Sequence, residues 1–100
     1  MAKQVIWSLR AQEDRKKILE YWRKRNGSAT YSRKLNFLFK EAISILKKFP
    51  QIGRLTDHPN VRFKIVRDYL VIYEETATTI YILTIWDSRQ DSNELEKLLR

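Results

Sequence analysis

Apolar residues recur at helical spacing in two consecutive segments of the first half of the chain. The first segment runs from about Ala11 to Arg25, and charged residues occupy its other faces. Gly27 suits a left-handed helix end, Ser28 suits the cap of a second helix, and Pro50 must stop that helix because it lacks a backbone N–H. With so few residues between them, the two helices are predicted to form an antiparallel hairpin. The apolar seam of the second helix consists of Tyr31, Leu35, Leu38, Ala42, Ile45 and Phe49.

The second half of the chain changes from helical spacing to short runs that suit β-strands. Three such runs, from Val61 to Val66, Tyr69 to Glu74 and Thr79 to Trp86, are separated by turn residues. A bulky run from Gln4 to Ser8 is predicted to be an opening strand whose last residue caps the first helix. The second and third of the later runs are apolar on both faces, which is typical of central strands covered on both sides. Residues 50–60, with both prolines, are predicted to be the main loop.

The end of the chain predicts a short helix. Asp91 and Glu94 have the spacing of a capping residue and its reciprocal partner, and Leu95, Leu98 and Leu99 then lie on one side, where we expect them to be exposed. The predicted fold is therefore α+β: an antiparallel, twisted sheet of about four strands with the helical hairpin on one face, a concave opposite face and a short C-terminal helix. Residues 1–100 are expected to form one domain.

The charge is concentrated in the helices. Residues 1–50 hold 13 Lys and Arg against 4 Asp and Glu, a net of +9, whereas residues 51–100 hold 7 against 8, a net of −1. Such a field favours a nucleic acid or an acidic protein as partner, and it is equally compatible with a solvated face that only aids solubility. The chain has no cysteine, no signal-peptide pattern and no stretch that could cross a membrane, so we expect it in the cytoplasm.

Several short motifs occur in a shared order along nearly the whole chain. They are an aromatic at the end of the opening strand, a Tyr-Trp pair in the first helix, a Pro-x-x-Gly turn followed by Arg, a Tyr-x-x-x-Tyr strand and an Arg after the last strand. In this order and spacing the chain resembles the RelE/ParE superfamily of bacterial toxins. The residues that carry the resemblance are Trp7, Tyr21, Trp22, Pro50, Gly53, Arg54, Val61, Arg62, Tyr69, Tyr73, Asp87, Ser88 and Arg89.

The resemblance implies a toxin of a type II toxin–antitoxin system, and it allows two activities. RelE-like members cut messenger RNA on the ribosome, and ParE-like members inhibit DNA gyrase. A nuclease without a metal needs a base, cations at the developing negative charge and an acid for the leaving oxygen. The residues that could supply such a set are Arg62, Lys64, Arg67, Arg89 and Tyr69, with Tyr73 or His58 as further proton carriers.

Two departures from the RelE-like pattern favour the ParE-like activity. The position after Tyr69, where nuclease members usually carry Arg, is Leu70, which cannot stabilise phosphate charge. Near the C-terminus, where nucleases usually carry a His or Tyr proton donor, the chain offers Asp87, Gln90, Asp91 and Asn93. We therefore predict a ParE-like growth inhibitor, with a RelE-like ribosome-dependent endonuclease as the alternative. No cofactor and no metal are expected.

Each candidate residue also has a structural interpretation. His58 lies between Asp57 and Pro59, where a turn residue is the more common role. Arg62 and Lys64 alternate with apolar residues and suit a solvated strand face, while Tyr69 and Tyr73 suit the core. Asp87 can pair with Arg89 as readily as it can take part in chemistry. Arg89 is the strongest functional candidate because it follows a central strand.

The partners implied by the toxin hypothesis are an acidic antitoxin and either DNA gyrase or the ribosome with its message, and a toxin–antitoxin hetero-oligomer is expected. The residues predicted to bind antitoxin or target are Asp87, Arg89, Leu95, Leu98 and Leu99. A double-stranded RNA-binding module is a weaker alternative, since it shares the order of a helix, three strands and a helix. Its last helix would need a basic start, whereas this one begins with Asp91, Ser92, Asn93 and Glu94.

Overall fold

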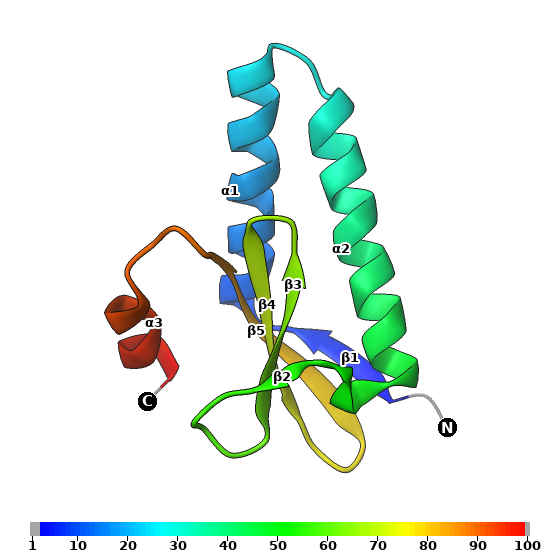
Figure 1. Cartoon of the computed structure of the whole chain (residues 1–100). Helices are drawn as coiled ribbons and strands as arrows, with labels where there is room; N and C mark the ends of the chain where they lie inside the picture. Colours follow the sequence, from blue (N-terminus) through cyan, green and yellow to red (C-terminus); the bar gives the residue numbers. More distant parts are fainter. Residues whose placement is uncertain (1–2, 100) are drawn as a thin grey trace.

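The computed structural model describes residues 3–99, in which three α-helices surround one five-stranded sheet (Figure 1). The predicted α+β class is confirmed. The strands lie in the spatial order β1-β5-β4-β3-β2. Along the chain the elements are β1 (Gln4–Trp7), α1 (Leu9–Asn26), α2 (Thr30–Lys48), the 3₁₀ helix η1 (Pro50–Ile52), β2 (Arg54–Leu55), β3 (Val61–Val66), β4 (Tyr69–Glu75), β5 (Thr79–Asp87) and α3 (Ser92–Leu99).

The sheet differs in two ways from the predicted antiparallel sheet of about four strands. First, β1 pairs with β5 in the parallel direction, with Gln4 opposite Thr79 and Trp7 opposite Ile82. No tight turn joins these strands, because the helical hairpin and β2 to β4 lie between them, so parallel pairing needs no strained connection. Second, β2 forms within the predicted loop of residues 50–60 and adds a two-residue fifth strand beside β3.

Local chemistry sets the ends of the helices in the hairpin. Ser8 caps α1 as predicted, because its Oγ accepts a hydrogen bond from Ala11 N at 2.9 Å. Gly27 ends α1 with a φ of 66°, which glycine adopts without strain. The cap of α2 is Ala29 and not the predicted Ser28, whose hydroxyl reaches only the first helical N–H, at 3.4 Å.

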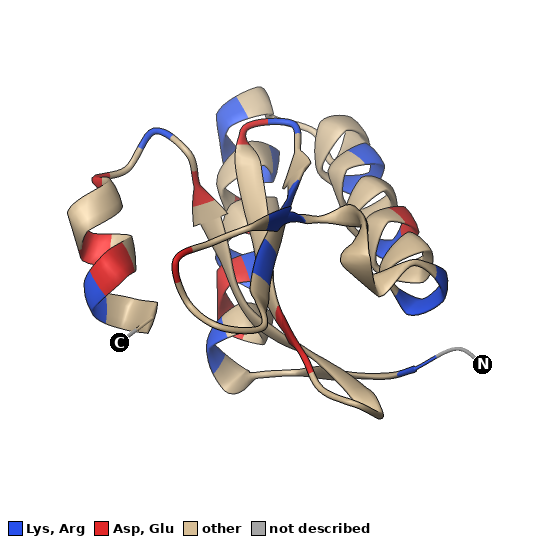
Figure 2. Cartoon of the chain, turned by 60° about the horizontal axis from the view of Figure 1, so that its bottom comes forward, with Lys and Arg blue, Asp and Glu red and all other residues tan. Residues whose placement is uncertain are grey.

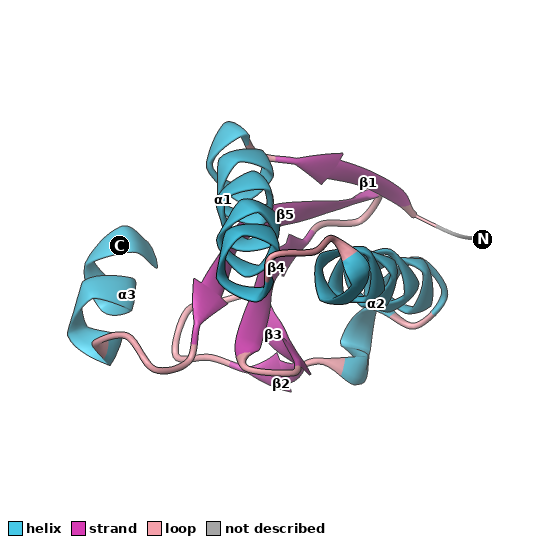
Figure 3. Cartoon of the chain, turned by 90° about the horizontal axis from the view of Figure 1, so that it is seen from above, coloured by secondary structure: helices cyan, strands magenta, loops and turns pink. Residues whose placement is uncertain are grey.

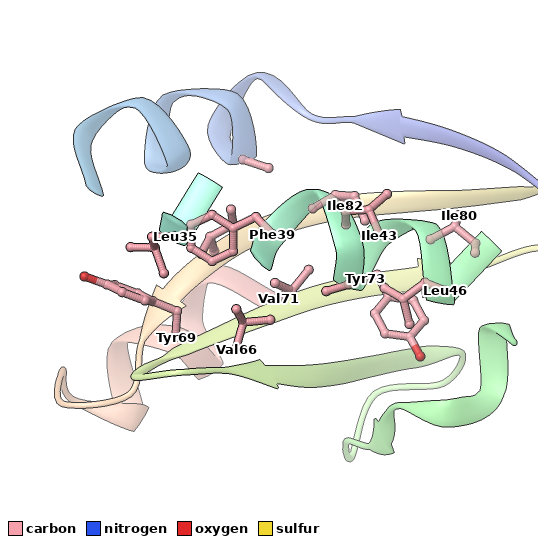
Figure 4. Packing of buried hydrophobic residues seen from close by; sticks show 13 residues of the cluster. Leu35, Phe39, Ile43, Leu46, Val66, Tyr69, Val71, Tyr73, Ile80 and Ile82 are labelled. Atoms are coloured by element: carbon pink, nitrogen blue, oxygen red, sulfur yellow. The ribbon is translucent and has the colours of Figure 1, made fainter. Parts of the chain in front are cut away.

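The main core lies between the hairpin and one face of the sheet (Figure 4). Leu35, Phe39 and Leu46 of α2 are fully buried together with Val71 of β4 and Ile82 of β5. Each such side chain stabilises the fold by about 1.5–3 kcal/mol relative to an exposed position. Seen from above, α1 and α2 lie side by side over the sheet and α3 lies apart from them (Figure 3). The predicted packing of the hairpin on one face is therefore confirmed.

The C-terminal helix covers part of the opposite face of the sheet. Leu95 and Leu99 are half-buried, so the expectation that they are exposed is wrong; Leu98 is 38% exposed, as expected. The reason is the double apolar character of β4 and β5, whose second face also needs cover. The second apolar cluster, on which α3 packs, has the buried residues Val61, Ile72 and Trp86.

The start of α3 follows only half of the predicted capping arrangement. Asp91 acts as a cap, because its Oδ1 accepts a hydrogen bond from Asn93 N at 2.9 Å. Glu94 does not provide the reciprocal bond. Its carboxylate lies 3.6 Å from Lys97 Nζ, one helical turn further along.

The hydroxyl of Tyr73 fixes the turn between α2 and β2 to the core. It donates a hydrogen bond to Pro50 O at 2.6 Å and accepts one from Gly53 N at 3.0 Å. A Cβ at Gly53 would lie 2.9 Å from Phe63 O and closer still to the Tyr73 hydroxyl, so only glycine fits. Burial raises the pKa of Tyr73, which keeps the phenol protonated and able to donate.

Tyr73→Phe should therefore destabilise the fold. The substitution leaves the buried N–H of Gly53 without its partner, and such a loss costs about 1–3 kcal/mol. Urea unfolding followed by circular dichroism measures the change. Tyr81→Phe is the matched control, because Tyr81 is 37% exposed and should change stability by less than about 0.5 kcal/mol. Equal effects of the two substitutions would contradict the anchoring role of Tyr73.

Candidate functional site

A cleft of ≈ 540 Å³ lies between α1 and the ends of β4 and β5. It brings together residues from the first and last thirds of the chain, and most of its polar groups are charged. The cleft is lined by Arg10, Asp14, Lys17, Ile18, Tyr21, Tyr69, Ile85, Trp86, Asp87, Arg89 and Gln90.

Side chains from the start of α1 fix one wall of this cleft to β5. The strand continues past the end of β1, so part of its outer edge needs other hydrogen-bonding partners. Ser8 Oγ donates to Leu83 O at 2.8 Å. One carboxylate oxygen of Asp14 accepts from Ile85 N at 3.2 Å and also from the hydroxyl of Thr84. The wall is therefore held by hydrogen bonds to the strand as well as by apolar packing.

Tyr69 forms part of the wall and is also a core residue. Its side chain packs edge-on against Phe39, and its hydroxyl accepts a hydrogen bond from Trp22 Nε1 at 2.8 Å. Burial raises the pKa of Tyr69 even though the bond from Trp22 acts in the opposite direction. The core role proposed for Tyr69 from the sequence is the one that its contacts favour, and its phenol is neutral at ordinary pH.

Asp87 and Arg89 form a bidentate ion pair at the rim of the cleft. Arg89 Nε lies 2.9 Å from Asp87 Oδ1 and Nη2 lies 2.8 Å from Oδ2, and the backbone N–H of Arg89 also donates to Oδ1. The hydrogen bonds from Arg89 hold the pKa of the Asp87 carboxyl below its ordinary value. The same pair raises the pKa of Arg89. Because the planar fork of the guanidinium is already occupied by a carboxylate, Arg89 has little capacity left to grip a phosphate.

Arg10 and Asp14 repeat this arrangement more loosely on α1, with Arg10 Nε 3.5 Å from Asp14 Oδ1. Lys17 is the one cation of the cleft lining that makes no ion pair among residues 3–99. The cleft thus presents polar groups that are largely neutralised in pairs. Such a surface suits contact with another protein better than it suits a highly charged phosphate.

Arg62 lies away from the cleft and has a structural role. Its Nη1 donates to Gly53 O at 2.9 Å and to Gln51 O at 3.2 Å. The side chain therefore holds the same turn that Tyr73 holds, and the two residues are opposite each other in the β3–β4 register. The structure does not bring Arg62 together with Tyr69 or Arg89.

The two other basic nuclease candidates lie in a third place. Lys64 and Arg67 line a hollow of ≈ 270 Å³ between β3 and α2, together with Glu41 of the helix. Arg67 is part of the β3–β4 turn and has a φ of 56°. The predicted cationic set is therefore divided among three locations.

His58 contacts the C-terminal helix. Its Nε2 lies 3.1 Å from Glu96 Oε2, so the residue links the loop before β3 to α3. This contact is consistent with the structural role inferred for His58 from the sequence. Of the three leucines proposed for binding, only Leu98 is exposed, since Leu95 and Leu99 pack against the sheet.

The contribution of α1 to the cleft was not predicted from the sequence. Arg10, Asp14 and Lys17 follow one another at spacings of four and three residues, which places them on one face of a helix. This spacing could have indicated that the three residues share one face of the helix. The sequence does not show that this face meets the end of β5, which is about seventy residues further along the chain.

Two kinds of feature are absent from the described residues. Over residues 3–99, no group of three or more His, Asp or Glu side chains is placed to bind a metal ion. None of the three helices described for that range is both long and apolar enough to cross a membrane.

Comparison with known proteins relates this arrangement to a toxin family. Residues 5–92 match the family described as the ParE toxin of the type II toxin–antitoxin system, parDE. A solved chain from the chromosomal ParDE toxin–antitoxin system of P. aeruginosa superposes with a TM-score of 0.74 at 19% sequence identity, over 86% of this chain and 96% of that chain. No curated protein sequence matches the chain.

Arg89→Ala should raise the pKa of Asp87 toward its ordinary value, because the strongest contribution to its lowered pKa is the hydrogen bond from Arg89. Since a depressed folded-state pKa stabilises the fold above the unfolded value, this stabilisation is lost as the pH falls through the folded value. Titration of the carboxyl carbon by NMR measures the shift. Lys97→Ala, on α3, is the control and should leave Asp87 unchanged. An unchanged Asp87 titration in Arg89→Ala would contradict the pairing.

Proposed function

Because the chain belongs to the ParE toxin family of type II toxin–antitoxin systems, we propose that it blocks growth by inhibiting DNA gyrase and that a cognate acidic antitoxin neutralises it. The family match over residues 5–92 is the observation that carries this proposal. A gyrase target would place the toxin in the cytoplasm.

The candidate nuclease residues lie far apart in the structure. This separation favours a toxin that inhibits by binding its target and not by cutting RNA. Metal-free phosphoryl transfer needs a base, an acid and cations that converge on one phosphate. Here Arg62 binds two backbone carbonyls and Arg89 binds Asp87. Lys64 lies in the hollow beside α2, and Leu70 packs in the apolar cluster under α3. These contacts leave no position at which the candidate residues could act together on one phosphate.

The cleft beside α1 is the surface that we propose for the target. It is open, rigidly backed by β5, and offers the unpaired Lys17 and the exposed ring of Tyr21 next to two arginine–carboxylate pairs. Tyrosine and arginine are the side chains most enriched where proteins bind each other tightly. In this proposal Asp87 and Arg89 contact the target through the sides of their ion pair that face away from each other.

For the antitoxin we propose the surface of α3. Leu98 is an exposed apolar residue beside the half-buried Leu95 and Leu99, so a partner helix could extend the apolar cluster that α3 already covers. The basic balance of the whole chain, a net charge of +8, favours an acidic partner. Together the two chains would form a hetero-oligomer.

Purified toxin should inhibit supercoiling by gyrase in vitro and leave messenger RNA intact in a reconstituted translation system. Lys17→Ala should raise the concentration needed for half inhibition by about tenfold or more, since hot-spot contacts cost about 2 kcal/mol when truncated. Lys97→Ala is the control of equal charge change and should inhibit like the parent. Cleavage of ribosome-bound messages, with gyrase unaffected, would establish the RelE-like alternative instead.

Leu98→Ala should weaken the complex with the cognate antitoxin by about tenfold or more, roughly 1.4 kcal/mol. Calorimetric titration of the toxin with the antitoxin measures the affinity. Leu9→Ala makes the same substitution at a leucine that is 79% exposed at the start of α1, and it should bind normally. Deleting residues 91–100 should weaken binding more strongly, although it also uncovers the second apolar cluster. Normal affinity in both variants would place the antitoxin elsewhere.

A further inference from the structure

The groove between α1 and α2 is a second charged feature, separate from the cleft described above. It consists of two adjoining hollows of ≈ 530 and ≈ 510 Å³ that share Lys16 and Leu19. Lysine and arginine residues occur along both helices of the hairpin (Figure 2). The cations that line the groove are Arg15, Lys16, Arg23 and Lys40.

The groove carries a net positive charge, because four cations line it against the two carboxylates of Glu13 and Glu20. None of its four cations makes an ion pair in residues 3–99. The groove also contains Glu13 and Glu20, but Glu20 is bound by Lys24 at 3.1 Å, outside the lining, and the bond to Lys24 lowers the pKa of Glu20. Lys16 and Arg23 also lower the pKa of Glu20, so the four cations are partly balanced, but they still outnumber the two carboxylates and would attract a polyanion.

One of the cations is held in position, and two others have a regular spacing on α1. Arg15 stacks over the ring of Trp7 at 4.7 Å, which orients its guanidinium without using its hydrogen-bond donors. Lys16 and Arg23 lie seven residues apart on α1, about 10 Å along the helix axis, which is close to the rise of three base pairs of B-DNA. Asn36 of α2 lines the same hollow as Lys16, and its Oδ1 is buried with no hydrogen-bond partner in residues 3–99.

We propose that this groove binds the sugar–phosphate backbone of duplex DNA without regard to base sequence. An acidic helix is a poorer occupant, because helix-in-groove binding requires a row of apolar anchors and the lining offers Leu19 alone. Phosphates need only cations and polar donors, which the groove supplies. The inference goes beyond gyrase inhibition and can hold whether or not gyrase is the target, since DNA binding is measured without gyrase.

Fluorescence anisotropy with a labelled 24-base-pair duplex tests the proposal on the full-length toxin between 50 and 200 mM KCl. Lys16→Gln/Lys40→Gln should weaken binding by about tenfold or more, and it should reduce the slope of log K against log salt by about 1.8, since each lost phosphate contact removes about 0.9. The matched control is Lys47→Gln/Lys48→Gln, which removes the same charge from exposed residues at the other end of α2. It should retain the parent affinity within about threefold.

Three results would overturn the proposal. The first is equal weakening by the two double variants, which would mean that net charge alone drives binding. The second is tighter binding of a labelled polyglutamate than of the duplex, which would indicate an acidic protein as the partner. The third is tighter binding of a single-stranded RNA of the same length. Thermal unfolding of both variants, followed by circular dichroism, confirms that each is folded before its affinity is compared.

Discussion

Burial of β4 and β5 on both faces is the constraint on which the rest of the structure depends. One face of this strand pair is covered by the hairpin, where Phe39 packs against Tyr69, and the other is covered by α3 through Leu95 and Leu99. A sheet with two apolar faces cannot leave either in water without losing much of the stability of a 100-residue chain. The hairpin therefore has to lie on the sheet, and its docking places α1 beside the C-terminal end of β5. The cleft follows from that contact.

Much of this fold could be predicted from the sequence because its signals are local. The strand from Val61 to Val66 has the predicted boundaries, and β4 and β5 each extend one residue further. The features that could not be predicted depend on distant partners. Nothing in Gln4–Trp7 specifies a parallel neighbour, since the direction of β1 is determined by where the hairpin returns the chain. With two residues, β2 is too short to show an alternation of apolar and polar positions, and its pairing with β3 requires the turn that Tyr73 anchors.

The candidate site was less predictable than the fold for the same reason. The pairing of Asp87 with Arg89 was foreseen because the two residues are neighbours in sequence. The role of Arg62 was not, because the carbonyls it binds belong to a turn nine and eleven residues earlier, and sequence alone does not bring them near. Asp14 is the extreme case. A mid-helix carboxylate among basic residues predicts a surface ion pair, yet its main partners are on β5, about seventy positions away.

The charged residues of α1 lie on two faces that contact different parts of the protein. On the side toward β5, Arg10 pairs with Asp14 and lies in the same cleft as the pair of Arg89 with Asp87, while Lys17 makes no ion pair in residues 3–99. In the groove between α1 and α2, Lys16 and Arg23 are exposed and make no ion pair within residues 3–99, where solvent screens their repulsion at little cost to stability. Most of the Lys and Arg residues that give the first fifty residues a net charge of +9 are exposed on the two helices of the hairpin. Substitutions at such exposed positions are expected to change stability by less than about 0.5 kcal/mol, so the charge of this surface can vary with the partner while the core stays the same.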